Sequence, residues 1–508
     1  MITGKESIEL LKQTVRLKPN IAESHYNLGV AYGESGDWDN AIESYSEAIR
    51  LKPDLSEAHY NLGIAYGKSD NYQKAIESYK EAIRLKPDYA GTHNNLGVAY
   101  EKSKDLHKAI ESYKQAIHLA PDFAAAYYNL GVAYRESGDL HKAIESYKQA
   151  INIKPDTTEA YFGLGIAYEE TGDLKKAIEL YKDSIRSKID EAEAQYNLGI
   201  VYGKSQDFNK QIEAFKKAIS LKPDDAMSYF GLGTAYGKLK DYQKAIESYK
   251  ESIRLKSDFT DAYYNLGIIY GKTDEWEKSI ESFKETLRIK PEYTQAHYNL
   301  GIALGKLKDY QKAIESYKQA INIKPDYAKA YFGLGVAYGK SGDLKNEIKS
   351  YKQAIIIKSD FIEAYNNLGV AYSESGYYQG AIESYKEAIR LKPDYAEAHY
   401  NLGITYAESG DYQKAIELYK QAIHFKPGYA KAYHSLGIAY GKTGDQKKEL
   451  ESYKESVRIK SDYANAHYSL GVAYHKTNNR GHALGEYKIL RNLDKELADN
   501  LFNLIYAK

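Results

Sequence analysis

Apolar and small side chains recur along the chain in two stripes, each with the spacing of one face of an α-helix. In residues 396–429 the first stripe is formed by His399, Leu402, Gly403 and Tyr406. The second stripe of the same segment is formed by Ala415, Ile416, Tyr419, Ala422 and Ile423. The pattern predicts two amphipathic helices, each of which buries the face that carries its stripe.

A turn signal separates the two stripes. The sequence ESGD places Gly410 where a helix can end in a left-handed residue, and Asp411 where the next helix needs a side-chain acceptor for its first N–H groups. We therefore expect an antiparallel helix hairpin. The small residue Gly403 lets the two helices approach closely, and the ring of Tyr419 fills the space beside the contact.

The whole pattern repeats every 34 residues. The Gly of the first stripe occurs fourteen times without an insertion, at Gly29, Gly63, Gly97, Gly131, Gly165, Gly199, Gly233, Gly267, Gly301, Gly335, Gly369, Gly403, Gly437 and Gly471. Each repeat is numbered from the residue seven before this Gly, so that the Gly has position 8, repeat 1 covers residues 22–55 and repeat 14 covers residues 464–497. All 10 prolines occupy position 32, where proline ends the second helix. The sequence predicts an uninterrupted array of helix hairpins.

These positions resemble the tetratricopeptide repeat (TPR), with Leu and Gly at positions 7 and 8, Tyr at 11, Ala at 20, Tyr at 24, Ala at 27 and Pro at 32. The resemblance covers fourteen tandem units over residues 22–497. It implies an all-α, right-handed α-solenoid, a superhelix of stacked antiparallel hairpins whose first helices line a concave surface. Leu304 replaces Tyr at position 11, and Gln211, Glu347 and Glu449 replace Ala at position 20. We expect those repeats to pack less tightly.

The two ends of the chain depart from the repeat. Residues 1–21 contain SIELLKQTVRLKP, which is in phase with a second helix whose first helix is missing, and predict an N-terminal capping half-repeat. Residues 498–508 are in phase with a first helix but carry Ile505 in place of Gly, and predict a C-terminal capping helix. A start on half a hairpin is also what a chain cut from a longer protein would show.

Asparagine recurs in the middle of the predicted first helix, although it is a poor helix former. It occupies position 6 in nine repeats, at Asn27, Asn61, Asn95, Asn129, Asn197, Asn265, Asn299, Asn367 and Asn401. Position 6 shares a face with position 9, which is Val or Ile in thirteen repeats. A side-chain amide can pair with both the N–H and the C=O of an extended peptide, so these residues are the candidate peptide-binding residues. The alternative is that each Asn caps a neighbouring helix or faces water.

The asparagine series is similar to the inner ladder of the TPR arms in the protein O-GlcNAc transferase family. This resemblance implies amides that hold a peptide backbone regardless of its sequence. It also raises the alternative that the chain is the substrate-recognition arm of a related glycosyltransferase whose catalytic domain is absent from this chain.

Charge at position 13 changes along the chain. Lys occupies this position in five successive repeats, at Lys204, Lys238, Lys272, Lys306 and Lys340. Glu occupies it toward the two ends, at Glu34, Glu136, Glu170, Glu374 and Glu408. A basic band for acidic partners is one interpretation, and solvated charge at the end of a helix is the other.

The composition argues against several classes of function. The chain has 70 basic and 70 acidic residues, so it lacks the basic excess typical of nucleic-acid or anionic-membrane binding. No apolar run approaches the ~20 residues of a membrane span, so we expect no membrane insertion and a cytoplasmic protein. The absence of cysteine removes thiolate metal sites and cysteine nucleophiles.

No cofactor or metal is expected. The stretch GVAYGKS at residues 335–341 lacks the glycine spacing of a phosphate loop and lies within a predicted helix. Six histidines occupy position 4, at His25, His59, His93, His297, His399 and His467. Position 4 belongs to the apolar stripe, so packing is favoured over metal ligation.

Every position of the repeat has a role in packing, capping, solubility or the predicted groove, which leaves no segment for a catalytic domain. We therefore expect a non-enzymatic scaffold that binds extended peptide segments of other proteins in its concave groove. Self-assembly into a structural scaffold is an alternative, because nearly identical repeats of two chains could stack end to end.

Overall fold

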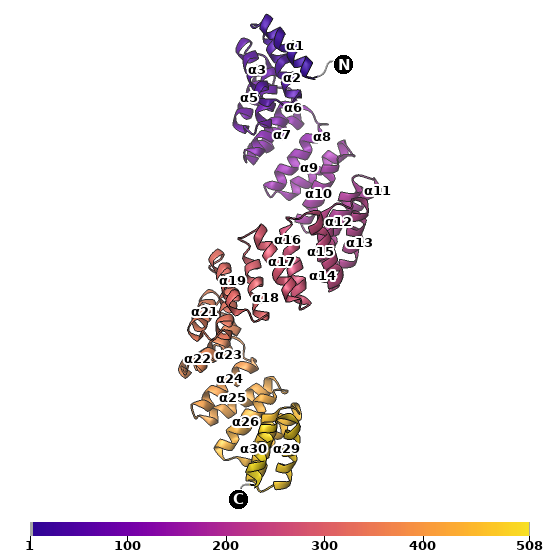
Figure 1. The fold of residues 1–508 in the computed structure, drawn as a ribbon. Coiled ribbons are helices and arrows are strands. Elements are labelled where there is room, and N and C mark those ends of the chain that lie inside the picture. The colour runs from indigo at the N-terminus through magenta and orange to yellow at the C-terminus, as the bar shows by residue number, and fades with distance from the viewer. Residues whose placement is uncertain (1–3, 507–508) are drawn as a thin grey trace. The chain divides into compact units, whose positions relative to one another are not determined.

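The computed structural model describes residues 4–506, and every regular element in that range is an α-helix (Figure 1). The chain divides into two compact units, Met1–Ser257 and Asp258–Lys508. The prediction of an all-α array of hairpins is therefore confirmed. The first three residues of the predicted N-terminal cap and the last two of the predicted C-terminal cap lie outside the described residues.

The first unit contains α1 (Gly4–Leu17), α2 (Ala22–Glu34), α3 (Trp38–Leu51), α4 (Ser56–Lys68), α5 (Tyr72–Leu85), α6 (Ala90–Lys102), α7 (Leu106–Leu119), α8 (Ala124–Glu136), α9 (Leu140–Ile153), α10 (Thr158–Glu170), α11 (Leu174–Arg186), α12 (Glu191–Lys204), α13 (Phe208–Leu221), α14 (Ala226–Lys238) and α15 (Tyr242–Leu255). Even-numbered helices up to α28 are the first helices of repeats 1 to 14, and the odd-numbered helices that follow them are the second helices.

The second unit contains α16 (Thr260–Lys272), α17 (Trp276–Ile289), α18 (Thr294–Lys306), α19 (Tyr310–Ile323), α20 (Ala328–Lys340), α21 (Leu344–Ile357), α22 (Ile362–Glu374), α23 (Tyr378–Leu391), α24 (Ala396–Glu408), α25 (Tyr412–Phe425), α26 (Ala430–Thr443), α27 (Gln446–Ile459), α28 (Ala464–Lys476), α29 (Arg480–Leu493) and α30 (Lys495–Tyr506).

The turn inside each hairpin follows the predicted chemistry. Gly410 has a φ of +86°, and the Asp411 carboxylate accepts a hydrogen bond of 3.1 Å from the Lys414 N–H. Repeats without Gly at this position also adopt a positive φ, as at Lys240 with 63°. Because the left-handed residue occurs in all fourteen repeats, the hairpin geometry is uniform even where the residue is not glycine.

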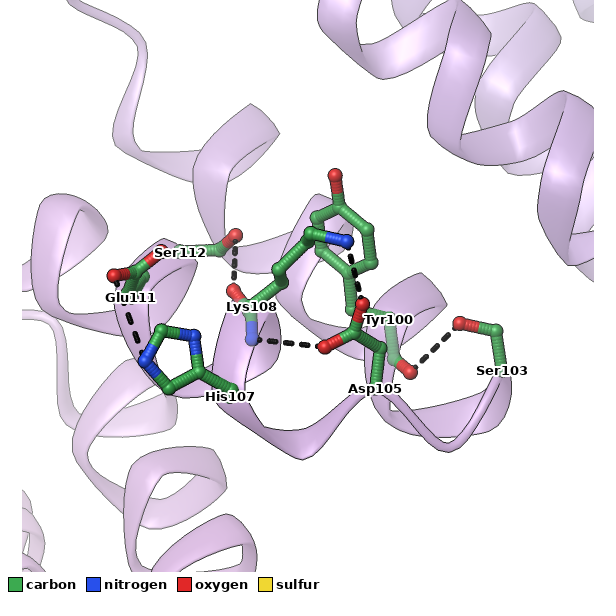
Figure 2. A network of polar contacts seen from close by, with 7 residues as sticks. All are labelled: Tyr100, Ser103, Asp105, His107, Lys108, Glu111 and Ser112. Carbon is green, nitrogen blue, oxygen red and sulfur yellow. Dashed lines mark hydrogen bonds and ion pairs between the residues drawn. The ribbon is translucent and has the colours of Figure 1, made fainter.

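Figure 2 shows this turn between α6 and α7. The Asp105 carboxylate caps α7 by accepting from the Lys108 N–H at 3.2 Å, and it also accepts from the Lys108 ammonium at 2.7 Å. The same ammonium lies 5.6 Å from the centre of the Tyr100 ring, and the Ser103 hydroxyl donates to the Tyr100 carbonyl. The cap therefore also ties the second helix to the end of the first.

The two helices of a hairpin meet at a glycine. In α8 the buried residues are Ala126, Leu130, Gly131, Ala133 and Tyr134. A Cβ placed on Gly131 would lie 2.7 Å from a ring carbon of Tyr147 in α9. Only glycine leaves room for this ring, so the predicted close approach at position 8 is confirmed.

Position 4 departs from the prediction. It is only half-buried in most repeats, because Ala at position 3 takes the buried place instead. The His399 Nε2–H donates to the carbonyl of Pro393 at 2.9 Å. The same bond to position 32 of the preceding repeat is made by His25, His59, His93, His297 and His467. These histidines satisfy a carbonyl beyond the end of the second helix, that of a proline in five cases and that of Ser461 for His467.

Within each unit, the first helices contact one another directly. Helix α4 contacts α2 and α6, and α18 contacts α16 and α20, whereas the second helix α5 packs between α4 and α6. The first helices therefore lie on the inner side of the local curvature of each unit. At the C-terminal end, α30 packs on α28 and α29, and its Leu501 is fully buried against Gly471. No helix among the described residues is long and apolar enough to cross a membrane.

Candidate peptide-binding face

The asparagines at position 6 connect consecutive first helices. The Asn61 side-chain N–H donates to the Tyr26 hydroxyl at 3.1 Å, and the Asn95 N–H donates to the Tyr60 hydroxyl at 3.2 Å. In the second unit the Asn299 side-chain N–H donates to the Tyr264 hydroxyl at 3.0 Å. The partner is position 5 of the preceding repeat in each case. Neither helix capping nor simple hydration describes these side chains.

Repeats that carry Asn at position 5 use the same link. The Asn129 N–H donates to the Asn94 side-chain oxygen at 3.0 Å, and the Asn401 N–H donates to that of Asn366 at 3.1 Å. Where serine replaces Asn at position 6, it still pairs with position 5, since Ser469 lies 2.9 Å from His434 Nε2. Positions 5 and 6 thus form a polar row that joins neighbouring repeats.

The other predicted asparagines lie at the same position in their helices. Asn197 makes a long contact of 3.5 Å with Glu193 of its own helix, and Asn367 one of 3.5 Å with the Tyr351 hydroxyl. Asn27 in α2 is exposed, and Asn265 in α16 is half-buried. An amide carries two N–H donors and an acceptor oxygen, so a single bond to a neighbouring repeat uses only part of its capacity.

Two consecutive first helices meet at what we call a joint. The joints α4–α6 and α18–α20 each contain a cavity. Between α4 and α6 the cavity measures about 370 Å³ and is lined by Ile64, Gly67, Lys68, Tyr72, Tyr79, Asn95, Val98, Ala99 and Lys102. Between α18 and α20 it measures about 260 Å³ and is lined by the same repeat positions, Ile302, Gly305, Lys306, Tyr310, Tyr317, Gly333, Val336, Ala337 and Lys340. Gly67 and Gly305, at position 12, each have open space where a Cβ would stand. The first cavity brings a predicted peptide-binding residue, Asn95, together with the position-9 aliphatics.

The sequence pattern of one family covers most of the chain. The pattern described as "TPR repeat" matches residues 31–70, 68–104, 102–136, 131–172, 235–274, 306–342, 340–376, 371–410, 405–444 and 448–478. The chain belongs to the TPR family. Two further patterns, both described as "Tetratricopeptide repeat", match residues 158–188, 192–225 and 260–293, and residues 214–247. No curated protein matches the chain.

Several solved structures are also similar to the chain. YrrB, described as a TPR protein with an unusual peptide-binding site, is 25% identical over 37% of this chain and 96% of its own, with a TM-score of 0.34. MamA is 31% identical over 34% of this chain and 95% of its own, with a TM-score of 0.32. The structure of Naa15/Naa10 bound to HypK is 14% identical over 99% of this chain and 94% of its own, with a TM-score of 0.41.

Other joints of the TPR array are filled by one larger side chain. Tyr113 donates a hydrogen bond of 2.9 Å to Glu101 at position 12, and Tyr181 donates one of 3.0 Å to Glu169. Arg135, also at position 12, forms an ion pair of 3.2 Å with the Glu170 carboxylate of the next repeat. A large side chain at position 12 therefore fills the joint.

The substitutions at position 20 fill the same space from the second helix. A Cβ on Gly339 would lie 2.5 Å from a carboxylate oxygen of Glu347, and one on Gly441 would lie 2.6 Å from Glu449. Both carboxylates are buried, and Gln211 packs against Gly203 in the same way. The expectation of looser packing in these repeats is wrong, because the larger side chain occupies the room that glycine at position 12 leaves.

Burial raises the pKa of both glutamates, Glu347 and Glu449. It raises the pKa of Glu347 to about 7, and the neighbouring negative charge of Glu374 adds to the effect. No group of three or more His, Asp or Glu in the described part of the chain is arranged to hold a metal ion.

The lysines at position 13 do not share one environment. Lys204 pairs with the Glu169 carboxylate at 2.7 Å, and the ammonium of Lys306 lies 5.7 Å from the centre of the Trp276 ring. Lys68 and Lys102 lie at the rim of the open joint between α4 and α6. The sequence pattern missed the open joints. Both have Gly at position 12, Tyr at 17 and Ala at 20, but repeat 7 has the same three residues, Gly237, Tyr242 and Ala245.

Proposed function

We propose that this TPR protein is a non-enzymatic scaffold that binds extended peptide segments of other proteins along the face formed by its first helices. The observation that carries the proposal is the cavity between α4 and α6, in which the Asn95 amide stands beside the aliphatic side chains of Ile64 and Val98. A face of this kind can hold the peptide backbone by hydrogen bonds and its side chains by apolar contact.

The repetition of the face supports an extended ligand rather than a compact one. The amides recur in nine of the fourteen repeats, with four in succession at Asn27, Asn61, Asn95 and Asn129. Asn61, Asn95 and Asn129 each donate to a side chain of the preceding first helix, so these three amides are held in a fixed orientation. Fixed donors and acceptors reduce the entropy that binding would otherwise cost.

A peptide array tests the proposal. Fluorescently labelled full-length chain is applied to overlapping peptides of varied sequence, and the same array is probed with the variant that carries Asn27→Ala, Asn61→Ala, Asn95→Ala and Asn129→Ala. The chain should capture many extended segments, and the variant should lose most of them. Capture of no segment by the parent chain would contradict the proposal.

The structure provides a matched control for this variant. Because Asn61 and Asn95 also donate to Tyr26 and Tyr60, their loss could act through the contact between helices. The double variant Tyr26→Phe and Tyr60→Phe removes those hydrogen bonds and leaves the amides in place. It should keep its array binding. If it loses binding as fully as the alanine variant does, the asparagines only position the helices.

The asparagine row favours a second candidate, the substrate-recognition arm of an O-GlcNAc-transferase-like glycosyltransferase. The nine amides at one repeat position carry this resemblance. The arm of such an enzyme would present segments with a free Ser or Thr hydroxyl. Captured array peptides should then be enriched in these residues, and equal capture of peptides without Ser and Thr would remove this candidate.

Self-association is the third candidate, and exposed leucines on α1 favour it. Leu17 is 82% exposed and Leu10 is 57% exposed, although both belong to an amphipathic helix. Light scattering against concentration measures the mass directly. A mass that stays at one chain up to high concentration would contradict self-assembly.

A further inference from the structure

We propose that the two open joints, α4–α6 and α18–α20, are subsites for acidic segments, in which an apolar side chain enters the cavity and neighbouring Asp or Glu carboxylates pair with the lysines at its rim. This inference rests on the proposed peptide-binding function and specifies the chemistry of the ligand. It assigns one subsite to each compact unit.

The floor of each cavity is apolar. Between α4 and α6, Ile64 and Val98 stand opposite the buried ring of Tyr79, and the glycine at position 12 leaves the entrance unobstructed. A volume of about 370 Å³ falls within the range of pockets that enclose small ligands. Burying an apolar side chain here is favourable, because it removes apolar surface from water on both partners.

The rim of each cavity is basic. The first cavity is flanked by Lys68 and Lys102, and both side chains are exposed. The lining residues include these two ammonium groups and no carboxylate. The ion pairs of the described residues, such as that of Lys86 with Glu57, do not involve either lysine. The charge is therefore available to a ligand, and it complements an acidic one.

Two carboxylates next to the rim lysines in sequence accept hydrogen bonds from tyrosine hydroxyls, and one of them is Asp70, which accepts from Tyr72. Glu101 precedes Lys102 in α6, and it accepts a hydrogen bond of 2.9 Å from the Tyr113 hydroxyl in the next joint. In the second cavity the rim consists of Lys306 and Lys340, both exposed. Lys306 lies over the Trp276 ring, a weak attraction that leaves its charge exposed to solvent.

Repeats 13 and 14 provide a control with the same pair of lysines and a filled joint. Lys442 and Lys476 occupy position 13 in consecutive first helices, as Lys68 and Lys102 do. There the space above Gly441 is filled by the buried carboxylate of Glu449. A ligand that needs both the cavity and the two lysines should therefore ignore this joint.

The chemistry favours an acidic peptide over nucleic acid. A phosphate backbone needs many distributed cations, and the chain has no net positive charge. The described cavities combine only two ammonium groups with an apolar floor, which suits a carboxylate next to an apolar side chain.

Fluorescence anisotropy of the full-length chain tests the inference. The probe is a labelled peptide in which Leu alternates with Asp, and its control has Asn in place of each Asp. One variant carries Lys68→Gln, Lys102→Gln, Lys306→Gln and Lys340→Gln, and a second carries Gly67→Gln and Gly305→Gln. The second variant fills the cavities without changing charge, and open space at both glycines lets it fold. The control variant carries Lys442→Gln and Lys476→Gln.

We expect the Asp peptide to bind the parent chain and the control variant equally. It should bind each of the other two variants about tenfold more weakly, and its affinity should fall as salt is added, because exposed ion pairs are screened. Equal binding of the Asp and Asn peptides would overturn the inference, as would an equal loss in the control variant. Binding of single-stranded DNA in place of the peptide would also overturn it.

The test separates this inference from the proposed function. If the peptide array shows capture but neither probe peptide binds at the open joints, acidic recognition is wrong and the peptide scaffold stands. If the array shows no capture, the scaffold proposal fails as well.

Discussion

Two adjacent joints of the second unit have the same arrangement of helices, but one contains a cavity and the other is filled by a side chain. The joint α18–α20 has Gly305 at position 12 and Ala313 at position 20, and it encloses a cavity of about 260 Å³. The joint α20–α22 also has glycine at position 12, Gly339, but Glu347 at position 20 fills the space above it. One side chain of the second helix therefore decides whether the face formed by the first helices is hollow or solid.

The charge at the rim changes together with the interior. The open joint is flanked by Lys306 and Lys340, whereas the next joint is flanked by Lys340 and Glu374. A nearly uniform array thus presents different chemistry from one joint to the next. Specificity in such a protein can come from a few substitutions at positions 12, 13 and 20, while the packing positions stay constant.

The largest expected effect compares two glycines of α18. Gly301 faces the Tyr317 ring, which would lie 2.7 Å from an added Cβ, whereas Gly305 faces open space. Gly301→Leu should therefore lower the free energy of unfolding by about 3 kcal/mol, the upper end of the range for overpacking. Urea unfolding followed by circular dichroism measures the change. A loss below that of Gly305→Leu would mean that position 8 is not the close contact.

The next effect concerns the pH dependence of the filled joint. Burial raises the pKa of Glu347 to about 7, compared with 4.5 as its ordinary value. Between about pH 4.5 and pH 7 the folded chain therefore binds a proton that the unfolded chain does not, so stability falls as the pH rises through this window. Glu347→Gln should remove this loss.

The gain from Glu347→Gln should grow as the pH rises from about 4.5 to 7, and it should be complete above pH 7. We expect it to be on the order of 1 kcal/mol, since solvent screens part of the charge effect. Urea titrations at pH 5 and pH 8 measure the difference, and the exposed substitution Glu315→Gln in the same unit is the control. A gain of equal size at both pH values would contradict the assignment of the effect to the ionised carboxylate.

The smallest effect comes from alanine at position 12 of the two joints. Gly305→Ala should stabilise α18 by about 0.5–1 kcal/mol, because alanine loses less backbone entropy than glycine and meets no neighbouring atom. Gly339→Ala should gain nothing or lose stability, because the added Cβ would meet the Glu347 carboxylate at 2.5 Å. Thermal unfolding of both variants gives the comparison. Equal gains would mean that Glu347 does not fill its joint.

Much of the fold followed from the sequence because its determinants are local. The left-handed residue at Gly410, the cap at Asp411 and the contact of Gly131 with Tyr147 each depend on residues within one hairpin. The burial of position 4 was predicted wrongly, because periodicity does not show that Ala at position 3 packs deeper.

The candidate site was predicted only in outline. The pattern located the asparagines, but their bonds to position 5, such as Asn95 to Tyr60, depend on how one repeat is set against the previous one. An open joint depends on the residues at positions 12, 17 and 20, which meet only in space. For the same reason the sequence predicted looser packing at Glu347, which instead fills its joint. The role of the asparagines in peptide binding stays a prediction.

Photo-crosslinking tests the central claim most directly, because it reports where a peptide lies. Benzoylphenylalanine is placed at Ile302 on the face formed by the first helices, or at the exposed Glu315 on the second helix of the same repeat. The account predicts that a captured peptide becomes attached from residue 302 and not from residue 315. Attachment from residue 315 alone, or from both residues equally, would contradict peptide binding by the first-helix face.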